Sequence, residues 1–319
     1  MFGERRAQWR LRTPAGRPTA VAGLLIAAVF VLAACQPVQA PATAPAEAPA
    51  TSATEATPEE SAAPATAAGD PIAGSYLFSV AMGCGCHFNR DLGGPAGGNK
   101  FEGPFGIVNA ANLTADPETG LGTWSDQQIA DAIRFGKRND GTNLAPMMPR
   151  FATLADKDVM DLVAFVRTFE PIANAVPAPE LTVFVPDYVP PTPPPAEAPT
   201  EPAARGGYLA SLVRCGQCHT PTNEDGSPNR TLFLAGAPFR DTVAPNLTPD
   251  EATGLGAWSE QEIADFLRTG IYADGLESHP GMKGVVDRGL RNLTEEDALA
   301  IAAFLKSLPP VANLPQAQQ

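Results

Sequence analysis

Two short segments of the sequence combine cysteine and histidine at spacings that suit covalent haem attachment. The clearer one is Cys215-Gly-Gln-Cys218-His219, the C-x-x-C-H pattern of c-type haem sites. On a helical turn the two thiols face the same side and can reach the vinyl groups of one haem, while the next residue offers its imidazole to the iron. A zinc site would need further cysteine or histidine ligands, and a redox dithiol would not need the histidine. This segment therefore predicts one covalently bound haem.

The second segment, "MGCGCH" at residues 82–87, has one residue instead of two between its cysteines. Nothing is deleted, because Gly83 takes the place of the missing cysteine and that cysteine stands one position later. Side chains two residues apart on a helix point about 200° apart, so both thiols can reach vinyl groups only if the backbone unwinds locally. We expect haem to bind with Cys86 attached and His87 as ligand, and Cys84 to be either a second thioether or free. The alternative is that this segment has lost its haem.

A methionine stands at the same aligned position in each half of the chain, as Met148 and as Met282. A thioether sulfur is the usual ligand opposite histidine in electron-transfer haems of the c type, and it raises their potential. We therefore expect Met148 and Met282 to be the sixth iron ligands. Met147 is the alternative in the first half. His279, three residues before Met282, is the alternative in the second.

These residues belong to two copies of one sequence unit. Residues 112–136 align without a gap to residues 246–270, and 16 of the 25 positions are identical. Self-similarity of this kind indicates an internal duplication. Each copy of about 100 residues is expected to hold one haem c, which gives two haems in the chain.

Each copy carries signals for three helices and few signals for strands. The expected helix starts are a first helix before each cysteine pair, the capping boxes Ser125/Gln128 and Ser259/Glu262, and the later caps Thr153 and Thr294. The predicted fold class is all-α, with two tandem class I cytochrome c domains in which a haem completes a core that is small on its own. Trp124 and Trp258 are expected in the helix core, with the haem edge as the alternative.

Stretches rich in proline and alanine separate these copies from the rest of the chain. Residues 36–70 contain no aromatic residue and are expected to form a disordered tether. Residues 172–204 are expected to be an extended spacer, whose part 181–189 either lies as a strap along one domain or is plain linker. The predicted domains are residues 71–171 and 205–311, followed by a tail, 312–319.

Residues 1–35 have the pattern of an export signal, in which five arginines precede a 15-residue apolar run that ends in Leu-Ala-Ala-Cys35. This ending resembles the lipobox of bacterial lipoproteins, in which the signal is cut before the cysteine and the cysteine is acylated. The run is shorter than the roughly 20 residues that a spanning helix needs, which disfavours an uncleaved anchor. We expect an exported protein, anchored to a membrane through lipid on Cys35 and facing the periplasm or the cell exterior.

The chain is acidic, with a formal net charge of -13, and cleavage of the signal would remove five arginines and one glutamate. Such a charge disfavours nucleic acid as a partner. It favours a redox protein with a basic docking face, chiefly by steering encounter. The alternative is that the charge only solvates the surface of an exported protein.

The sequence resembles diheme class I cytochromes c, especially the cytochrome subunits of membrane-bound alcohol and gluconate dehydrogenases. The motifs that carry the resemblance are "GGYLASLVRCGQCH", "APNLTPDEATGLGAWSEQEIADFLRTG" and "LTEEDALAIAAFLKSLPPV" in the second copy, with "NLTADPETGLGTWSDQQIADAIRFG" and "LAPMMPRF" in the first. The resemblance implies haems with histidine and methionine ligands and the transfer of single electrons. The C-x-C-H spacing departs from it, as does the presence of two haem segments where those subunits commonly have three.

We therefore expect a diheme c-type cytochrome that relays single electrons between a membrane or extracytoplasmic donor and an acceptor. It would act as a carrier or as the electron-transfer subunit of a dehydrogenase, without a catalytic residue of its own. The alternative is a diheme redox enzyme of the peroxidase or thiosulfate-oxidising type, which needs an open or unusual iron coordination.

Overall fold

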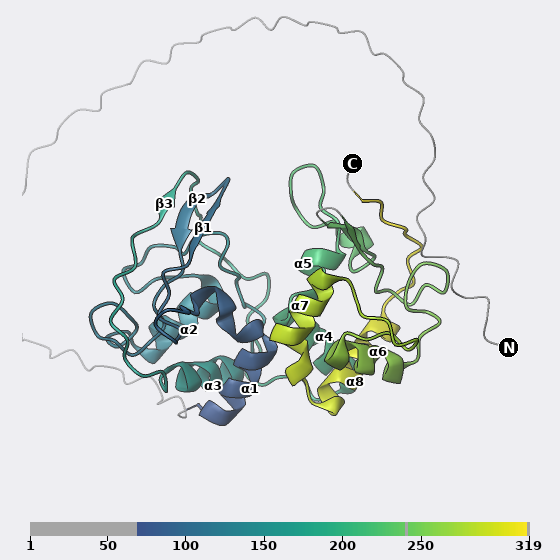
Figure 1. The fold of residues 1–319 in the computed structure, drawn as a ribbon, viewed down its shortest axis with the longest axis horizontal. Helices are drawn as coiled ribbons and strands as arrows, with labels where there is room; N and C mark the ends of the chain where they lie inside the picture. Colours follow the sequence, from purple (N-terminus) through teal and green to yellow (C-terminus); the bar gives the residue numbers. More distant parts are fainter. Residues whose placement is uncertain (1–68, 240–241, 318–319) are drawn as a thin grey trace, which may run out of the picture. The chain divides into compact units, whose positions relative to one another are not determined.

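A computed structural model describes residues 69–239 and 242–317, and within these ranges it is rich in helices (Figure 1). The predictions for the export signal, for Cys35 and for nearly all of the tether fall on residues outside the described ranges. The helices of the first copy are α1 (Pro71–Val80), the 3-10 helix η2 (Met82–His87), α2 (Asp126–Phe135) and α3 (Asp156–Val166). Those of the second copy are α4 (Pro202–Leu212), α5 (Cys215–His219), η3 (Arg230–Leu232), α6 (Glu260–Thr269), α7 (Pro280–Arg288), η4 (Leu290–Asn292) and α8 (Glu295–Ser307). No helix in the described ranges is long and apolar enough to cross a membrane.

The middle helix of each copy begins and ends at the signals that the sequence carries. At the start of α2, the Ser125 hydroxyl accepts a hydrogen bond from the Gln128 backbone N–H, and the Gln128 side chain accepts one from the Ser125 backbone. The capping box at Ser259 repeats these bonds in α6. Both helices end at a glycine in the left-handed conformation, Gly136 and Gly270, where a Cβ atom would be strained. The predicted capping boxes are thus confirmed.

The last helix of the first copy begins later than expected. The sequence places a cap at Thr153, but α3 begins at Asp156, after a residue with no capping side chain. In the second copy α8 begins as predicted, because the Thr294 hydroxyl accepts a hydrogen bond from the Asp297 backbone N–H. The structurally equivalent aspartates are therefore Asp158 and Asp297, each the third residue of its helix.

The first and last helices of each copy cross at a glycine, α1 against α3 and α4 against α8 (Figure 1). A Cβ atom on Gly74 would lie 1.9 Å from the carbonyl oxygen of Asp161. A Cβ atom on Gly206 would lie 1.8 Å from the carbonyl oxygen of Ala300. Only glycine permits so close an approach of two helix backbones. This crossing therefore sets the position of each first helix and of the Cys-His segment that follows it.

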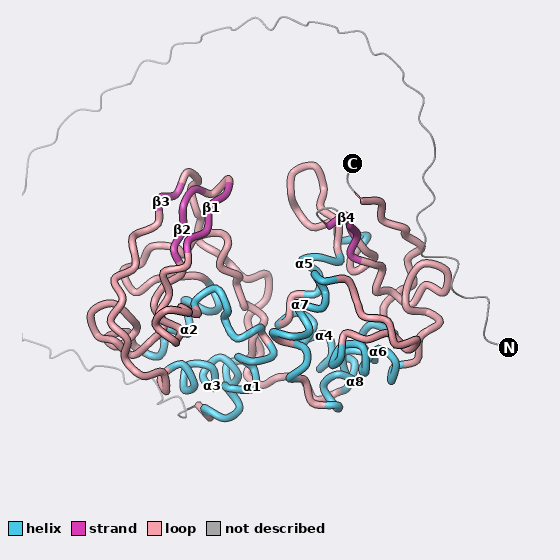
Figure 2. The backbone as a smooth tube through the Cα atoms, in the orientation of Figure 1, coloured by secondary structure: helices cyan, strands magenta, loops and turns pink. Residues whose placement is uncertain are grey.

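The expectation of an all-α fold needs a correction, because the described residues also form short strands (Figure 2). They are β1 (Lys100–Gly103), β2 (Gly106–Asn109) and β3 (Glu180–Leu181) in one antiparallel sheet, and β4 (Ala237–Phe239) and β5 (Thr242–Ala244) in another. None is longer than four residues. Alternating apolar and polar residues need a longer run to become recognisable, so the sequence gives no strand signal here.

Part of the proline-rich stretch lies along the first copy as a strap, which we define as residues 180–188. Its beginning is β3, and the Thr182 hydroxyl donates to a carbonyl in the β1–β2 turn at 2.8 Å. Further along, the Asp187 carboxylate accepts hydrogen bonds from the Lys137 ammonium group at 2.7 Å and from the Asn143 amide at 3.0 Å. The sequence left open whether this stretch lies along a domain as a strap or is plain linker, and the structure shows the strap.

The two copies share part of their hydrophobic core. The shared cluster includes Leu77, Val80 and Leu154 from the first copy and Leu209, Leu290 and Ile301 from the second. Two reciprocal hydrogen bonds accompany it. The Tyr76 hydroxyl donates to the Asp297 carboxylate at 2.5 Å, and the Tyr208 hydroxyl donates to the Asp158 carboxylate at 2.6 Å. Each tyrosine belongs to the first helix of one copy and each aspartate to the last helix of the other, so equivalent contacts join the copies.

Candidate functional site

The Cys-His segment of the second copy forms one short helix, α5 (Cys215–His219). It follows Arg214, whose backbone is left-handed with a φ of 61°. The Gln217 N–H donates to the Arg214 carbonyl at 3.0 Å, which closes the first turn. Cys215 and Cys218 therefore lie one helical turn apart, as covalent attachment to one haem requires.

The Cys-His segment of the first copy, η2 (Met82–His87), has a different backbone. Met82, the equivalent of Arg214, is left-handed with a φ of 67°, but the left-handed conformation then continues through Gly83 and Cys84, with φ values of 61° and 46°. Of these residues, only Cys84, with a ψ of 40°, has a torsion that lies between the two cysteines, so the backbone there departs from a regular helix at Cys84. Gly85, to which the sequence also assigned conformational freedom, does not adopt a positive φ.

Each candidate histidine is held by a backbone carbonyl. The Nδ1 atom of His87 lies 2.7 Å from the carbonyl oxygen of Ala111, and Nδ1 of His219 lies 2.7 Å from that of Pro245. A carbonyl can only accept, so Nδ1 carries the proton in both rings and Nε2 keeps the lone pair that binds a metal. Burial lowers the pKa of both histidines, which favours the neutral imidazole that is able to act as a ligand.

The carbonyls that hold the histidines are positioned by the repeated sequence Asn-Leu-Thr. Asn112 follows Ala111, is 2% exposed, and donates to the Ile172 carbonyl at 2.8 Å. Asn246 follows Pro245 and makes the equivalent bond to the Val311 carbonyl at 2.7 Å. These positioning residues were not singled out from the sequence. The signal that could have revealed them is the identity of this triplet in both copies.

Equivalent hydrogen bonds also hold the C-terminal end of each copy in place. Asn174 donates to the Ala96 carbonyl, and Asn313 donates to the Ala235 carbonyl, both at 2.8 Å. Both asparagines lie beyond the last helix of their copy. The ordered unit around each Cys-His segment therefore runs three residues past the prolines that end the helix signals.

The four described cysteines form no disulfide, and two of them have matched surroundings. Cys84 and Cys215 are both half-buried, and burial raises the pKa of each thiol to about 12. Cys86 is exposed, whereas Cys218 is half-buried. The buried thiols are therefore protonated at neutral pH.

The segments that carry the candidate methionines have the same register in both copies. The Leu144 N–H donates to the carbonyl of Gly136 at 2.7 Å, and the Ser278 N–H donates to that of Gly270 at 2.8 Å. Met148 lies four residues after Leu144, and Met282 lies four residues after Ser278. Both methionines are half-buried.

Only the second of these methionines lies in a helix. Met282 lies in α7 and packs against the shared core. Met148 lies in a turn, where the Arg150 guanidinium donates to the Met148 carbonyl at 2.5 Å and to the Leu144 carbonyl at 2.7 Å.

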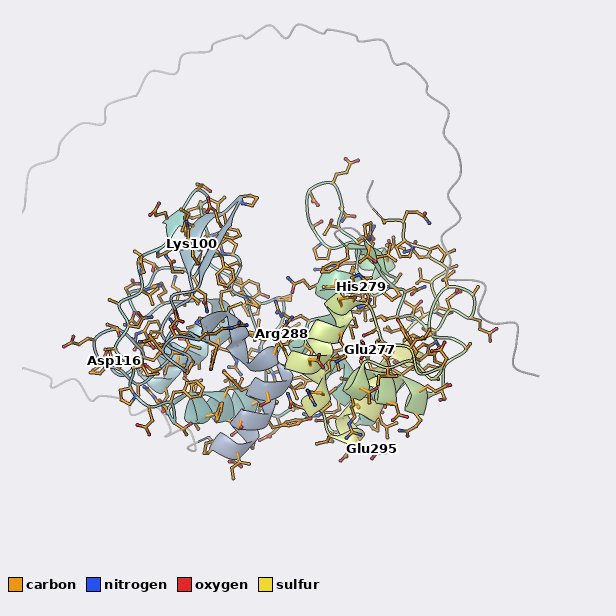
Figure 3. The ribbon with its side chains drawn as sticks, in the orientation of Figure 1. Lys100, Asp116, Glu277, His279, Arg288 and Glu295 are labelled. Atoms are coloured by element: carbon orange, nitrogen blue, oxygen red, sulfur yellow. The ribbon has the colours of Figure 1, made fainter. Side chains whose placement is uncertain are left out.

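The alternative ligand His279 has another role in the structure. It is exposed and precedes α7, where its Nδ1 accepts a hydrogen bond from the Gly281 N–H at 3.1 Å (Figure 3). It thus acts as the N-cap of the helix that contains Met282. The other alternative, Met147, is half-buried like its neighbour, and its burial does not separate the two.

The tryptophans belong to the helix cores, as expected. Trp258 packs edge-on against Phe266, with ring centroids 5.8 Å apart. Trp124 packs against the cluster that contains Leu121 and Val163. These rings stabilise the helices that flank the Cys-His segments.

The residues at the two segments fit a covalently attached haem. Each segment offers thiols and one neutral, oriented imidazole, and a methionine follows at the same register. In the described part of the chain, no group of three or more His, Cys, Asp or Glu side chains could hold a metal ion by itself. The zinc alternative therefore has no further ligands there.

Comparisons with known proteins agree with this chemistry. Residues 203–309 match the protein family described as "Cytochrome c". A protein described as "Diheme cytochrome c-type" from Cereibacter sphaeroides is 31% identical over 270 residues, which cover 76% of this chain and 87% of that protein.

Two dehydrogenase subunits are similar over much of the chain. The "Fructose dehydrogenase cytochrome subunit" of Gluconobacter japonicus is 31% identical over 277 residues, covering 78% of this chain and 55% of the subunit. The "Gluconate 2-dehydrogenase cytochrome c subunit" of Pantoea cypripedii is 34% identical over 264 residues, covering 74% of this chain and 58% of the subunit. The chain thus spans little more than half the length of these two relatives.

Proposed function

The chain belongs to the cytochrome c family, and we propose that it carries two haems c, one in each copy, and relays single electrons through both. The observation that carries this proposal is the repeated histidine arrangement. In each copy a half-buried imidazole follows a cysteine directly and donates from Nδ1 to a backbone carbonyl at 2.7 Å. This arrangement leaves one nitrogen for iron in both copies.

Four residues of the chain would hold the two irons. His87 and His219 would bind through Nε2, and Met148 and Met282, which stand at the same register in the two copies, would bind through sulfur. The haem, when bound, supplies an iron that alternates between ferrous and ferric states. Cys215 and Cys218 attach the second haem, and Cys86 attaches the first. The backbone carbonyls keep each imidazole in one orientation and tautomer in both oxidation states, so little rearrangement accompanies electron transfer.

The copies correspond to two tandem class I cytochrome c domains, residues 71–171 and 205–311, joined by the proline-rich residues 172–204. The support is the repetition of helices, glycine crossings and hydrogen bonds described above. The proline- and alanine-rich residues 36–70 precede the first domain, and the tail is residues 312–319.

The partners and location are inferred from charge and from the relatives. The formal net charge of -13 favours a redox partner with a basic docking face. The lipobox-like ending at Cys35 supports export and a lipid anchor, which would hold the protein at a membrane facing the periplasm or cell exterior. Because relatives are named as cytochrome subunits of dehydrogenases, we place a membrane-bound dehydrogenase as the electron donor.

A spectroelectrochemical titration of the full chain, matured with both haems, tests the relay function. We expect two reversible one-electron steps, and the reduced protein should bind no carbon monoxide, because each iron already has six ligands. Ready binding of carbon monoxide at either haem in the unmodified protein would contradict the relay and favour the redox-enzyme alternative.

A further inference from the structure

We propose that the first haem is held by two thioethers, from Cys84 and Cys86, although a single residue separates these cysteines. The inference rests on the proposed function, because it presupposes a haem in the first copy. It concerns the set of two thiols and one oriented imidazole within η2 (Met82–His87).

An unusual backbone in η2 compensates for the short spacing between Cys84 and Cys86. On a regular helix the side chains of residues 84 and 86 would point to nearly opposite sides. In the structure, Met82, Gly83 and Cys84 all have positive φ values, whereas in the second copy only Arg214 does so at the equivalent place. Of these left-handed residues, only Cys84 has a torsion between the two cysteines, and its ψ of 40° turns its Cα–Cβ bond relative to that of Cys86 away from the helical arrangement. The segment then continues to His87, whose bond to a carbonyl matches that of His219.

The unwound backbone is held by contacts to the second copy. Met82 and Cys84 are not glycines, and a left-handed backbone is disfavoured at such residues. Gly289 provides the space for this turn, because a Cβ atom there would lie 2.8 Å from Cγ of Met82 and 2.7 Å from the carbonyl oxygen of Val80. The conformation of η2 is thus part of the packing between the copies.

The thiol of Cys84 has the surroundings that Cys215 has in the second copy. Both side chains are half-buried, whereas Cys86 is exposed. Cys215 packs against the core that the copies share. Cys84 lies close enough to Arg214, the residue before Cys215, for its charge to act on the thiol. Both first cysteines therefore face the side where the copies meet.

The attachment chemistry needs no partner beyond the haem. Each thiol adds across one vinyl group, so that sulfur bonds to one vinyl carbon and the thiol hydrogen goes to the other. The C=C bond becomes a single bond, nothing leaves, and no electrons are gained or lost. Both thiols must be reduced beforehand, and no disulfide joins the described cysteines.

The test combines intact mass with thiol alkylation on the denatured, full-length holoprotein, followed by mass analysis of the proteolytic peptide that contains residues 82–90. We expect a mass gain of two haems and no alkylation in that peptide. Two haems with Cys84 alkylated would overturn the inference and leave the proposed function intact. A single haem, with both cysteines of the peptide alkylated, would overturn the proposed function as well.

Spectra of three variants test the two thioethers without thiol alkylation. The double change Gly83→Cys with Cys84→Gly restores the two-residue spacing, and we expect its pyridine haemochrome spectrum to match that of the unmodified protein. Cys84→Ala should keep two haems but shift the α band to longer wavelength, because one vinyl group stays conjugated. Cys215→Ala is the matched control in the second copy and should give a shift of the same size. An unshifted band for Cys84→Ala, beside a shifted band for Cys215→Ala, would contradict two thioethers.

Discussion

The orientation of each histidine is set by a residue far along the chain. Ala111 lies 24 residues after His87, and Pro245 lies 26 residues after His219. A backbone carbonyl has no sequence signature of its own, so the side chains alone could not reveal this contact. The cysteines, histidines and matched methionines could be found because their chemistry depends on residue type and spacing.

At the same scale, the methionine ligands can be tested by truncation. Met148→Ala removes a thioether ligand and should leave the first iron with an open position. We expect the potential of that haem to fall and carbon monoxide to bind at one of the two haems after reduction. Met282→Ala should do the same at the second haem. Potentiometry and carbon monoxide difference spectra measure both effects.

Met147→Ala is the matched control for this prediction. Met147 precedes Met148 and is similarly half-buried, but the aligned register places it opposite Gly281. Its truncation should leave the potentials unchanged. The ligand assignment is wrong if Met147→Ala opens the first haem to carbon monoxide and Met148→Ala does not.

Among the elements, the crossing of the first and last helices depends on glycine. Gly206→Ala would place a Cβ atom 1.8 Å from the Ala300 carbonyl oxygen, so the two helices must separate. We expect a loss of about 1–3 kcal/mol in the free energy of unfolding, measured by chemical denaturation. Gly207→Ala is the control, because its Cβ atom would meet only the Phe304 ring at 3.1 Å. Equal losses in the two variants would mean that the helix crossing does not depend on Gly206.

The strap contacts the first copy through hydrogen bonds at Asp187. Hydrogen bonds from Lys137 and Asn143 lower the pKa of the Asp187 carboxyl. Because this group is exposed, Asp187→Ala should change the free energy of unfolding only slightly. Amide hydrogen exchange should nevertheless become faster in the strap and in residues 141–148.

Asp225→Ala is the control for the strap. It removes an exposed turn carboxylate from the second copy and should leave exchange in the first copy unchanged. If Asp187→Ala leaves exchange in residues 141–148 as it was, the strap does not restrain the segment that carries Met148.

The helices with local signals were predictable from sequence, whereas the short strands and α7 were not. The boxes at Ser125 and Ser259 are read from four consecutive residues each. In α7 the Lys283 N–H donates to the His279 carbonyl, but the aligned residue of the first copy is Pro149, which has no N–H to donate. The aligned segments therefore differ in structure, and the alignment alone could not predict the helix.

For the molecule as a whole, the contacts between the copies involve buried charge. Burial by itself would raise the pKa of Asp297, but hydrogen bonds from Arg205 and Tyr76 outweigh this effect and lower it. Burial, together with the bond to Asp297, raises the pKa of Tyr76 to about 12, so this hydroxyl remains a donor. Tyr76 and Asp297 lie 221 positions apart, and no local pattern predicts their contact.

This cluster predicts a dependence of stability on pH. A carboxyl whose pKa is lowered by folding stabilises the folded state above its ordinary pKa of 3.8, and this contribution is lost as the pH falls through the lowered value. Asp297→Asn should therefore lose about 2–3 kcal/mol of unfolding free energy at pH 7, and the difference from the unmodified protein should shrink in acid below pH 3.8.

The control for this effect is an exposed ion pair. Asp287 bonds Lys283 one helical turn away, and Asp287→Asn should reduce the free energy of unfolding much less than Asp297→Asn does. Chemical denaturation across a range of pH measures both variants. A loss for Asp297→Asn that does not change with pH would show that its charge is not the cause.

The number of haems in the full chain tests the central claim most directly. Intact mass of the protein, matured with its haem-attachment machinery, should show two haems per chain. The His87→Ala and His219→Ala variants should each lose the normal low-spin spectrum of one haem. A single haem in the unmodified protein, bound only at the second segment, would contradict the two-haem relay and leave the first copy as a domain without a redox centre.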